Sequence, residues 1–169
     1  MKVQQKADLA LVLVAAFWGS TSFLTKMGLE DIEGFNLIAL RFIIAFFLMA
    51  PLFWKRLKAA NLIVVKHAAG LGAILFLNYI LFTFGVKHTS VSNAGFLTCL
   101  AGVMVPVIGF FYLKQKPDIK TVFCVLLVFI GAYLLTFNGE IQFNLGDFLC
   151  ILCSLAFALH IVTTGQLTR

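Results

Sequence analysis

The sequence predicts an all-α integral membrane protein, and three observations support this fold class. Of its 169 residues, 62% are hydrophobic and only 12% are charged, whereas soluble domains are about half apolar and a quarter charged. Six apolar runs of near-spanning length follow one another with short connections, and segments that cross a bilayer this way are helices. The basic residues lie between these runs, so the net charge of +6 indicates membrane orientation and not a nucleic-acid partner.

The six apolar runs define the order of the expected helices. Each is close to the length of about 20 residues that a helix needs to cross a bilayer, and no soluble domain separates them. We expect a five-helix transmembrane repeat over residues 1–138, followed by the first helix of a truncated second repeat over residues 139–169. The runs lie at residues 9–25, 35–54, 68–86, 91–113, 119–137 and 145–162.

Lysine and arginine gather in alternate connections, which predicts how the chain is oriented in the membrane. Because these residues accumulate in cytoplasmic loops, we expect a multi-pass protein of the cell (inner) membrane with a cytoplasmic N-terminus. Glu30, Asp31 and Glu33 fall in a connection that is expected outside. The connections expected in the cytoplasm contain Lys2, Lys6, Lys55, Arg56, Lys58, Lys66, Lys114, Lys116 and Lys120.

The first two runs contain polar residues that a bilayer accepts only with partners. Trp18 stands beside a glycine and three hydroxyl residues, a composition that fits either a cavity wall or a helix–helix interface. Lys26 lies near the outer end of its run, and we expect it to reach water. Arg41 lies about two turns inside the second run, where a charge is costly unless it is paired. We expect a structural anchor paired with the acidic residues of the preceding connection, and a solute-binding arginine is the alternative.

Asn78 and His160 are polar residues inside the third and sixth runs. An unsatisfied amide in hydrocarbon costs several kcal/mol, so Asn78 should face the bundle interior. Interhelical hydrogen bonding and solute contact are both open for it and for the neighbouring Tyr79. His160 is a candidate proton carrier or polar contact.

The fourth run combines small residues, a hydroxyl and a proline. Its glycines and alanines should let neighbouring helices approach closely, and Thr98 falls in its first third. Pro106 lacks a backbone N–H and its ring clashes with the preceding turn, which predicts a kink at that residue.

No group of residues in the sequence indicates catalysis or a cofactor. Cys150 and Cys153 form a C-x-x-C inside an apolar run, where thiols behave as small hydrophobes, and no second pair completes a metal site. Nothing resembles a nucleophile–base pair or a phosphate loop. We therefore expect no enzyme, no metal and no cofactor.

A weak internal repeat relates the first and sixth runs. Asp8 and Asp147 each lie at the head of their run, and aligning them sets Trp18 against Phe157. If the sixth helix opens a second copy after five spans, that copy must cross the membrane in the inverted direction. Inverted repeats around a midplane site are a recurring transporter design. The chain would then end one helix into its second copy, as a fragment or a truncated product would.

Several stretches resemble the EamA-like transporters of the drug/metabolite transporter superfamily. They read FWGSTSFLTKMGLE (17–30), ALRFIIAFFLMAP (39–51), KHTSVSNAGFLTCLAGVMVPVIGFFYLKQKP (87–117) and GAYLL (131–135). The resemblance implies two inverted five-helix repeats that move small metabolites through a cavity lined by the first, third and fourth helices of each repeat. One departure is Gln115, where the family often has an acidic residue. The residues that the resemblance places near the cavity are Trp18, Asn78, Tyr79, Thr98 and His160.

These observations together predict a membrane permease. We expect an exporter of small organic metabolites such as amino acids, working by alternating access. The alternatives are a half-length subunit that transports only when paired and a non-transporting truncated fragment. The expected partners are the lipid bilayer, a small-molecule solute, and either further copies of the chain in a homo-oligomer or a second half-transporter.

Overall fold

The computed structural model describes residues 3–114, 118–136 and 144–168, and within these ranges the chain is helical, without strands. The all-α membrane fold expected from the sequence is confirmed, because five helical segments are long and apolar enough to cross a bilayer. The α4–α5 pair forms one of these five segments, and α6 covers the fifth apolar run as far as Thr136. The helices are α1 (Val3–Asp31), α2 (Gly34–Lys58), α3 (Leu62–His88), α4 (Val91–Cys99), α5 (Ala101–Leu113), α6 (Ile119–Thr136) and α7 (Leu145–Leu167).

Short polar side chains fix the starts of three helices. The Asn61 side chain accepts the Val64 N–H at the start of α3, and Ser90 accepts the Asn93 N–H at the start of α4. Asn144 forms a reciprocal capping box with Asp147 at the start of α7. Such caps satisfy backbone donors that the helix itself leaves unpaired, so these connections can be short.

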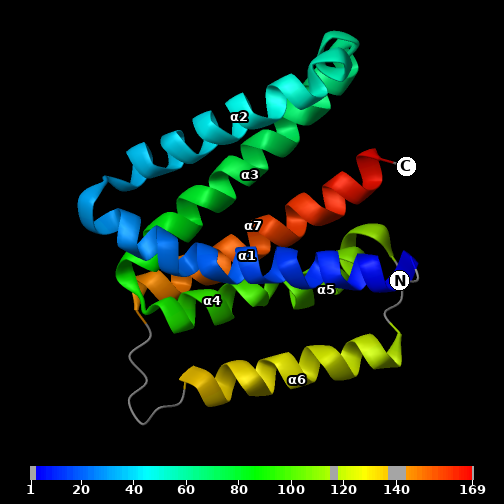
Figure 1. Cartoon of the computed structure of the whole chain (residues 1–169). Coiled ribbons are helices and arrows are strands. Elements are labelled where there is room, and N and C mark those ends of the chain that lie inside the picture. Colours follow the sequence, from blue (N-terminus) through cyan, green and yellow to red (C-terminus); the bar gives the residue numbers. More distant parts are fainter. Residues whose placement is uncertain (1–2, 115–117, 137–143, 169) are drawn as a thin grey trace.

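With α4 and α5 taken together as one span, successive spans run in opposite directions, and α7 is antiparallel to α1 (Figure 1). This is the relation expected if α7 opens a second copy after five spans. The start of α1, the α2–α3 connection and the ends of α5 and α7 lie at one end of the bundle. The basic residues of α2's last turn are Lys55, Arg56 and Lys58, so they lie at that end too. We call it the basic end, and which membrane side it faces stays a prediction.

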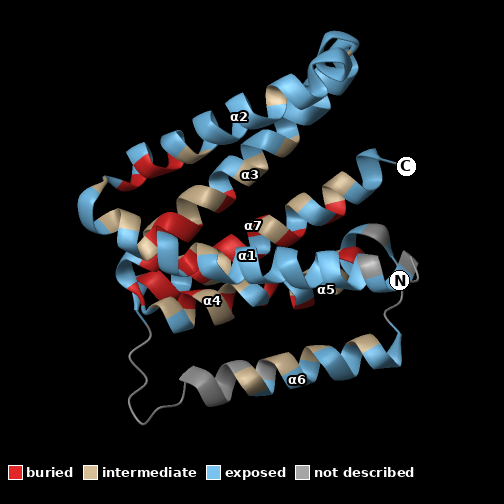
Figure 2. Cartoon of the chain, viewed as in Figure 1, coloured by how far each residue is buried: buried red, intermediate tan, exposed pale blue. Residues whose placement is uncertain are grey.

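The packed core lies between α3, α4 and α7, toward the end opposite the basic end (Figure 2). In the most apolar window of α7, 39% of the residues are buried, compared with 6% in α1 and in α2. α7 contacts α3, α4 and α5 and is therefore the central helix of the described structure. The buried apolar cluster consists of Phe82, Val86, Ala94, Leu97, Leu100, Cys150 and Cys153.

Two glycines allow α3 and α7 to approach closely. A Cβ atom added at Gly146 would lie 2.5 Å from the carbonyl carbon of His88. A Cβ atom added at Gly85 would lie 2.7 Å from the sulfur of Cys150. Neither position has room for a side chain, so this contact depends on small residues, as helix packing in membranes commonly does.

The fourth span is interrupted at Leu100, six residues before the expected kink at Pro106. α5 continues through the proline, and the kink expected at Pro106 stays a prediction, whereas the interruption at Leu100 was not predicted from the sequence. The Thr98 hydroxyl donates to the carbonyls of Ala94 and Gly95 at 2.9 Å each. The Ser154 hydroxyl of α7 donates to the Leu97 carbonyl at 2.5 Å.

These hydroxyl contacts explain the position of the interruption. In a continuous α-helix the Leu97 carbonyl would accept the N–H four residues later, but Ser154 and the Leu100 N–H (3.2 Å) bind it instead. Hydroxyl groups that bond helix carbonyls bend a helix, and a side chain that enters the backbone ladder breaks it. The break between α4 and α5 is therefore a consequence of packing against α7.

Candidate functional site

Two polar layers run between the helices, one on each side of α3. The first lies between α3 and α7 and contains Asn78 and His160. The second lies between α3 and the pair α1 and α2, and contains Tyr79 and Arg41. Trp18 extends from α1 toward α7. The residues predicted to bind solute are therefore not in one place: Asn78 and His160 lie in the first layer, and Tyr79 lies in the second.

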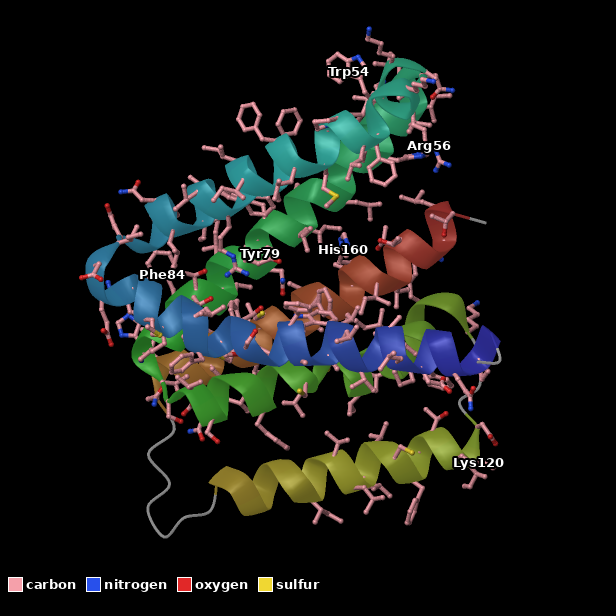
Figure 3. The ribbon with its side chains drawn as sticks, viewed as in Figure 1. Trp54, Arg56, Tyr79, Phe84, Lys120 and His160 are labelled. Atoms are coloured by element: carbon pink, nitrogen blue, oxygen red, sulfur yellow. The ribbon has the colours of Figure 1, made fainter. Side chains whose placement is uncertain are left out.

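Aromatic rings connect α1, α7 and α3 near the middle of the bundle. The rings of Trp18 and Phe157 meet edge to face with centroids 5.2 Å apart, and Phe157 is stacked with His160 at 6.4 Å. The His160 Nδ1 atom lies 3.2 Å from the Leu71 carbonyl oxygen of α3. Figure 3 shows His160 on the side of α7 that faces α3. Trp18 is 58% exposed, so most of its ring is available to a further partner or solute.

Asn78 joins α3 to α7 through a thiol. Its Oδ1 atom accepts a hydrogen bond from the Cys153 sulfur at 2.9 Å, and both side chains are buried. The interhelical alternative considered for Asn78 is therefore present in the structure. Sequence reasoning assigned Cys153 only to packing, because a thiol is a weak donor and its spacing gives no sign of a polar partner.

Thr98 has a local role in the described structure. Its side chain is half-buried, and its hydroxyl donates to carbonyls of its own helix. It thus contributes to the interruption between α4 and α5, and among the described residues its hydroxyl forms no hydrogen bond with the other four predicted residues. Its proximity to a solute stays a prediction.

Arg41 contacts a hydroxyl and an aromatic ring instead of a carboxylate. Its Nη1 atom donates to the Thr25 hydroxyl at 3.0 Å, and its guanidinium carbon lies 5.0 Å from the centroid of the Tyr79 ring. Among the described residues no carboxylate forms an ion pair with it, so the expected pairing with Glu30, Asp31 or Glu33 was wrong. Those three side chains are exposed near the end of α1 and the start of α2.

Lys26 is half-buried and binds the end of α3. Its Nζ atom donates to the carbonyls of Val86 (2.7 Å), Lys87 (3.2 Å) and Thr89 (2.9 Å). These are the unpaired acceptors at a helix C-terminus, where a cation is favoured. Sequence reasoning missed these partners because it treated α1 as an isolated helix, and contact of Lys26 with water stays a prediction.

A second contact binds the same end of α3 to α7. The Thr89 hydroxyl donates to Asp147 Oδ1 at 2.5 Å, and both residues are buried. We call Lys26, Thr89 and Asp147 the α3 C-terminal cluster. It connects three helices at the end of the bundle opposite the basic end.

One apolar groove of the described residues lies apart from both polar layers. It is lined by apolar side chains of α5 and α6, among them Pro106, Phe110 and Val122. None of the predicted solute-binding residues contributes to it. Within the described ranges, no three His, Cys, Asp or Glu residues are grouped as metal ligands.

A bundle of apolar helices with buried polar layers is typical of membrane transport proteins. Comparison with known proteins identifies the class: the chain belongs to the EamA-like transporter family, whose model matches residues 5–137. It is therefore a member of a family of multi-pass membrane transporters.

Three of the relatives are named as uncharacterized transporters. An uncharacterized transporter of Archaeoglobus fulgidus is 36% identical over 163 residues, which are 96% of this chain and 50% of that protein. A second uncharacterized transporter of that organism is 28% identical over 180 residues, 98% of this chain and 59% of that protein. The uncharacterized transporter YetK of Bacillus subtilis is 27% identical over 82% of this chain and 43% of its own length. The chain thus spans about half the length of these relatives, and no solved structure shows significant similarity.

Proposed function

We propose that the chain supplies one half of a permease that exports small organic metabolites, such as amino acids, by alternating access. In this proposal, residues 1–138 form a five-helix repeat. Residues 139–169 open a second repeat of opposite orientation. The solute cavity lies between the two repeats, so that this chain contributes one wall of it.

The observation that carries the proposal is the unequal burial of α1 and α7. α7 packs between α3 and the α4–α5 pair, whereas α1 leaves nearly all of its apolar window exposed. If the two helices are equivalent in inverted repeats, α1 should pack against the third and fourth helices of a second repeat in the same way. The contact between Trp18 and Phe157 supports this relation, because residues related by a twofold axis touch only near that axis.

The proposed solute site is formed by residues that face the aromatic contact and the polar layers beside α3. Trp18 and Tyr79 offer ring faces for stacking or apolar contact. Asn78 and His160 already have partners on neighbouring helices, and Thr98 lies beside a broken helix, a feature that often lines transporter sites. As the two repeats move relative to each other, a bound solute would replace these interhelical contacts of Asn78 and His160.

The α3 C-terminal cluster supplies the closed side of the proposed cavity. It connects α1, α3 and α7 through Lys26, Thr89 and Asp147. Toward the basic end the same helices are more exposed (Figure 2). In alternating access, opening the cluster's side would require these hydrogen bonds to break.

Solute counterflow in proteoliposomes tests the proposal. If further copies of the chain complete the cavity as a homo-oligomer, we expect labelled amino acids to accumulate in vesicles that contain this protein alone, and Trp18→Ala to lower the rate. Phe111→Ala is the matched control, since this aromatic residue of α5 is also exposed and lies outside the proposed site. Oriented vesicles give the direction of transport.

The exposure of α1 favours one alternative, a half-length subunit that transports only when paired. Co-reconstitution with the part of the 36% identical A. fulgidus relative that the chain does not cover distinguishes the two cases. Counterflow only in the mixed vesicles supports the paired subunit. An absence of counterflow from a broad metabolite mixture in both preparations contradicts a transport function.

A further inference from the structure

Arg41 is a membrane-embedded cation whose hydrogen-bonding capacity is mostly unused. It lies seven residues into α2, about 10 Å along the axis at 1.5 Å per residue. A guanidinium has five N–H donors, and in the described part of the chain Arg41 makes one hydrogen bond, to Thr25. The ring of Tyr79 covers one face of the cation at 5.0 Å.

The charge of Arg41 has no anionic partner within the described structure. Glu30, Asp31 and Glu33 are exposed and form no ion pair with it. A cation at membrane depth costs several kcal/mol unless it is paired or hydrated, and one hydroxyl with one aromatic face offsets only part of this. A planar anion is the partner that best fits a guanidinium group, because a carboxylate accepts two parallel hydrogen bonds from the guanidinium N–H groups.

A second polar group in the same layer also lacks a partner. The Thr83 hydroxyl is 1% exposed and makes no hydrogen bond in the described structure. It lies one helical turn from Tyr79 on the same face of α3. The Thr83 methyl group lies close to Gly34 of α2, about two helical turns from Arg41. The interface between α2 and α3 therefore contains an unpaired buried hydroxyl as well as the cation, and a buried polar group without a partner needs an explanation.

Aromatic side chains form an apolar wall beside the cation. The Tyr79 ring meets Phe42 edge to face at 5.2 Å, and Phe42 lies 6.2 Å from Phe76. Phe42 and Phe76 are partly exposed, so a ligand with an apolar body could lie against them. A charged group next to an apolar wall is a common arrangement in small-molecule sites.

We propose that Arg41, supported by Thr25 and Tyr79, binds the carboxylate of a transported solute whose apolar or aromatic body packs against Phe42. This inference rests on the proposed transport function and narrows its substrate class to small organic carboxylates. The same fork would accept the phosphate of a lipid headgroup. The test below separates a solute carboxylate from a lipid phosphate.

Fluorine NMR on the purified full chain measures binding with a matched pair of probes. The first is para-fluorobenzoate and the second is its neutral isostere para-fluorobenzamide. We expect the benzoate to bind and the benzamide to bind much more weakly. Arg41→Gln should weaken benzoate binding by on the order of tenfold or more, because a charge-assisted hydrogen-bonded pair is lost.

Two further variants keep the test independent of folding. Arg41→Lys retains the charge but cannot form the bidentate fork, so benzoate binding should still fall severalfold in a folded protein. Arg56→Gln is the control on the same helix, because this exposed arginine lies in the last turn of α2, and it should leave binding unchanged. Equal binding of the two probes, or unchanged benzoate binding in both Arg41 variants, would overturn the inference.

The lipid arm uses maltoside micelles, which carry no phosphate, and phosphatidylglycerol nanodiscs. Similar benzoate affinity in both supports a solute site. Binding in micelles that disappears in nanodiscs assigns the fork to lipid phosphate and overturns the solute site. If benzoate binds in an Arg41-dependent way but no counterflow occurs, the transport function is contradicted and the carboxylate site is retained. If neutral solutes show counterflow but benzoate does not bind, the carboxylate site is contradicted and the transport function is retained.

Discussion

At the scale of single residues, the α3 C-terminal cluster shows how a few polar contacts hold helix ends together. Asp147 accepts the Thr89 hydroxyl through one oxygen and the Asn144 N–H, at 3.2 Å, through the other. It is 3% exposed and serves both as a helix cap and as a connection between α3 and α7. Removing it should therefore affect both roles.

We predict that Asp147→Ala destabilises the protein by about 2–4 kcal/mol, from loss of the cap and from the unpaired Thr89 hydroxyl. Thermal unfolding in detergent micelles should show a midpoint lower by several degrees. Asp31→Ala is the control, because Asp31 is an exposed carboxylate at a helix end. Equal midpoints for the two variants would contradict the assigned role.

The same residues show what the sequence could and could not predict about the site. The need of Asn78 for a partner follows from its place in an apolar run, whatever the fold. The identities of the partners, Cys153 for Asn78 and the α3 carbonyls for Lys26, depend on the register between helices that are distant in sequence. The pairing expected for Arg41 was wrong for the same reason, because proximity along the chain favoured carboxylates that the fold leaves in solvent.

At the scale of elements, the apolar runs predicted the helices well because helix formation in a bilayer depends on local composition. The interruption of the fourth span at Leu100 was not predicted because its cause is tertiary. Pro106 is visible in the sequence, whereas the contact of Ser154 with the Leu97 carbonyl appears only when α7 is packed against α4. The element boundary is thus set by a hydroxyl from a helix more than fifty residues away.

We predict that Pro106→Ala leaves the interruption at Leu100 in place, while Ser154→Ala combined with Thr98→Val makes α4 and α5 continuous. The Leu97 carbonyl would then accept the N–H of residue 101, as in a regular helix. Loss of the buried Ser154 hydrogen bond should also cost about 1 kcal/mol. Backbone NMR shifts and amide exchange at residues 99–102 measure the change. A continuous helix in Pro106→Ala and a broken one in the double variant would contradict this explanation.

At the scale of the whole molecule, α7 holds the described helices together, and its docking on α3 depends on Gly146. A Cβ atom there would meet backbone atoms of His88 and Thr89 at 2.5 and 2.6 Å, which cannot move aside as a flexible side chain can. Gly165 of the same helix has open space around it. The two positions therefore differ in tertiary contact while sharing the same helix.

We predict that Gly146→Ala destabilises the protein by about 3 kcal/mol, the upper range for overpacking a close contact, while Gly165→Ala is neutral or stabilises it by up to about 1 kcal/mol through helix propensity. Displacing α7 should also separate Phe157 from Trp18. In a Trp54→Phe background, which leaves Trp18 as the single tryptophan, its fluorescence should then change in Gly146→Ala and stay constant in Gly165→Ala. The contact between Trp18 and Phe157 joins α1 and α7, the two helices proposed to be equivalent. Trp18 fluorescence that stays unchanged when α7 is displaced would therefore contradict a twofold axis between these helices. Unfolding midpoints that fall equally in both variants would show that α7 does not dock through Gly146.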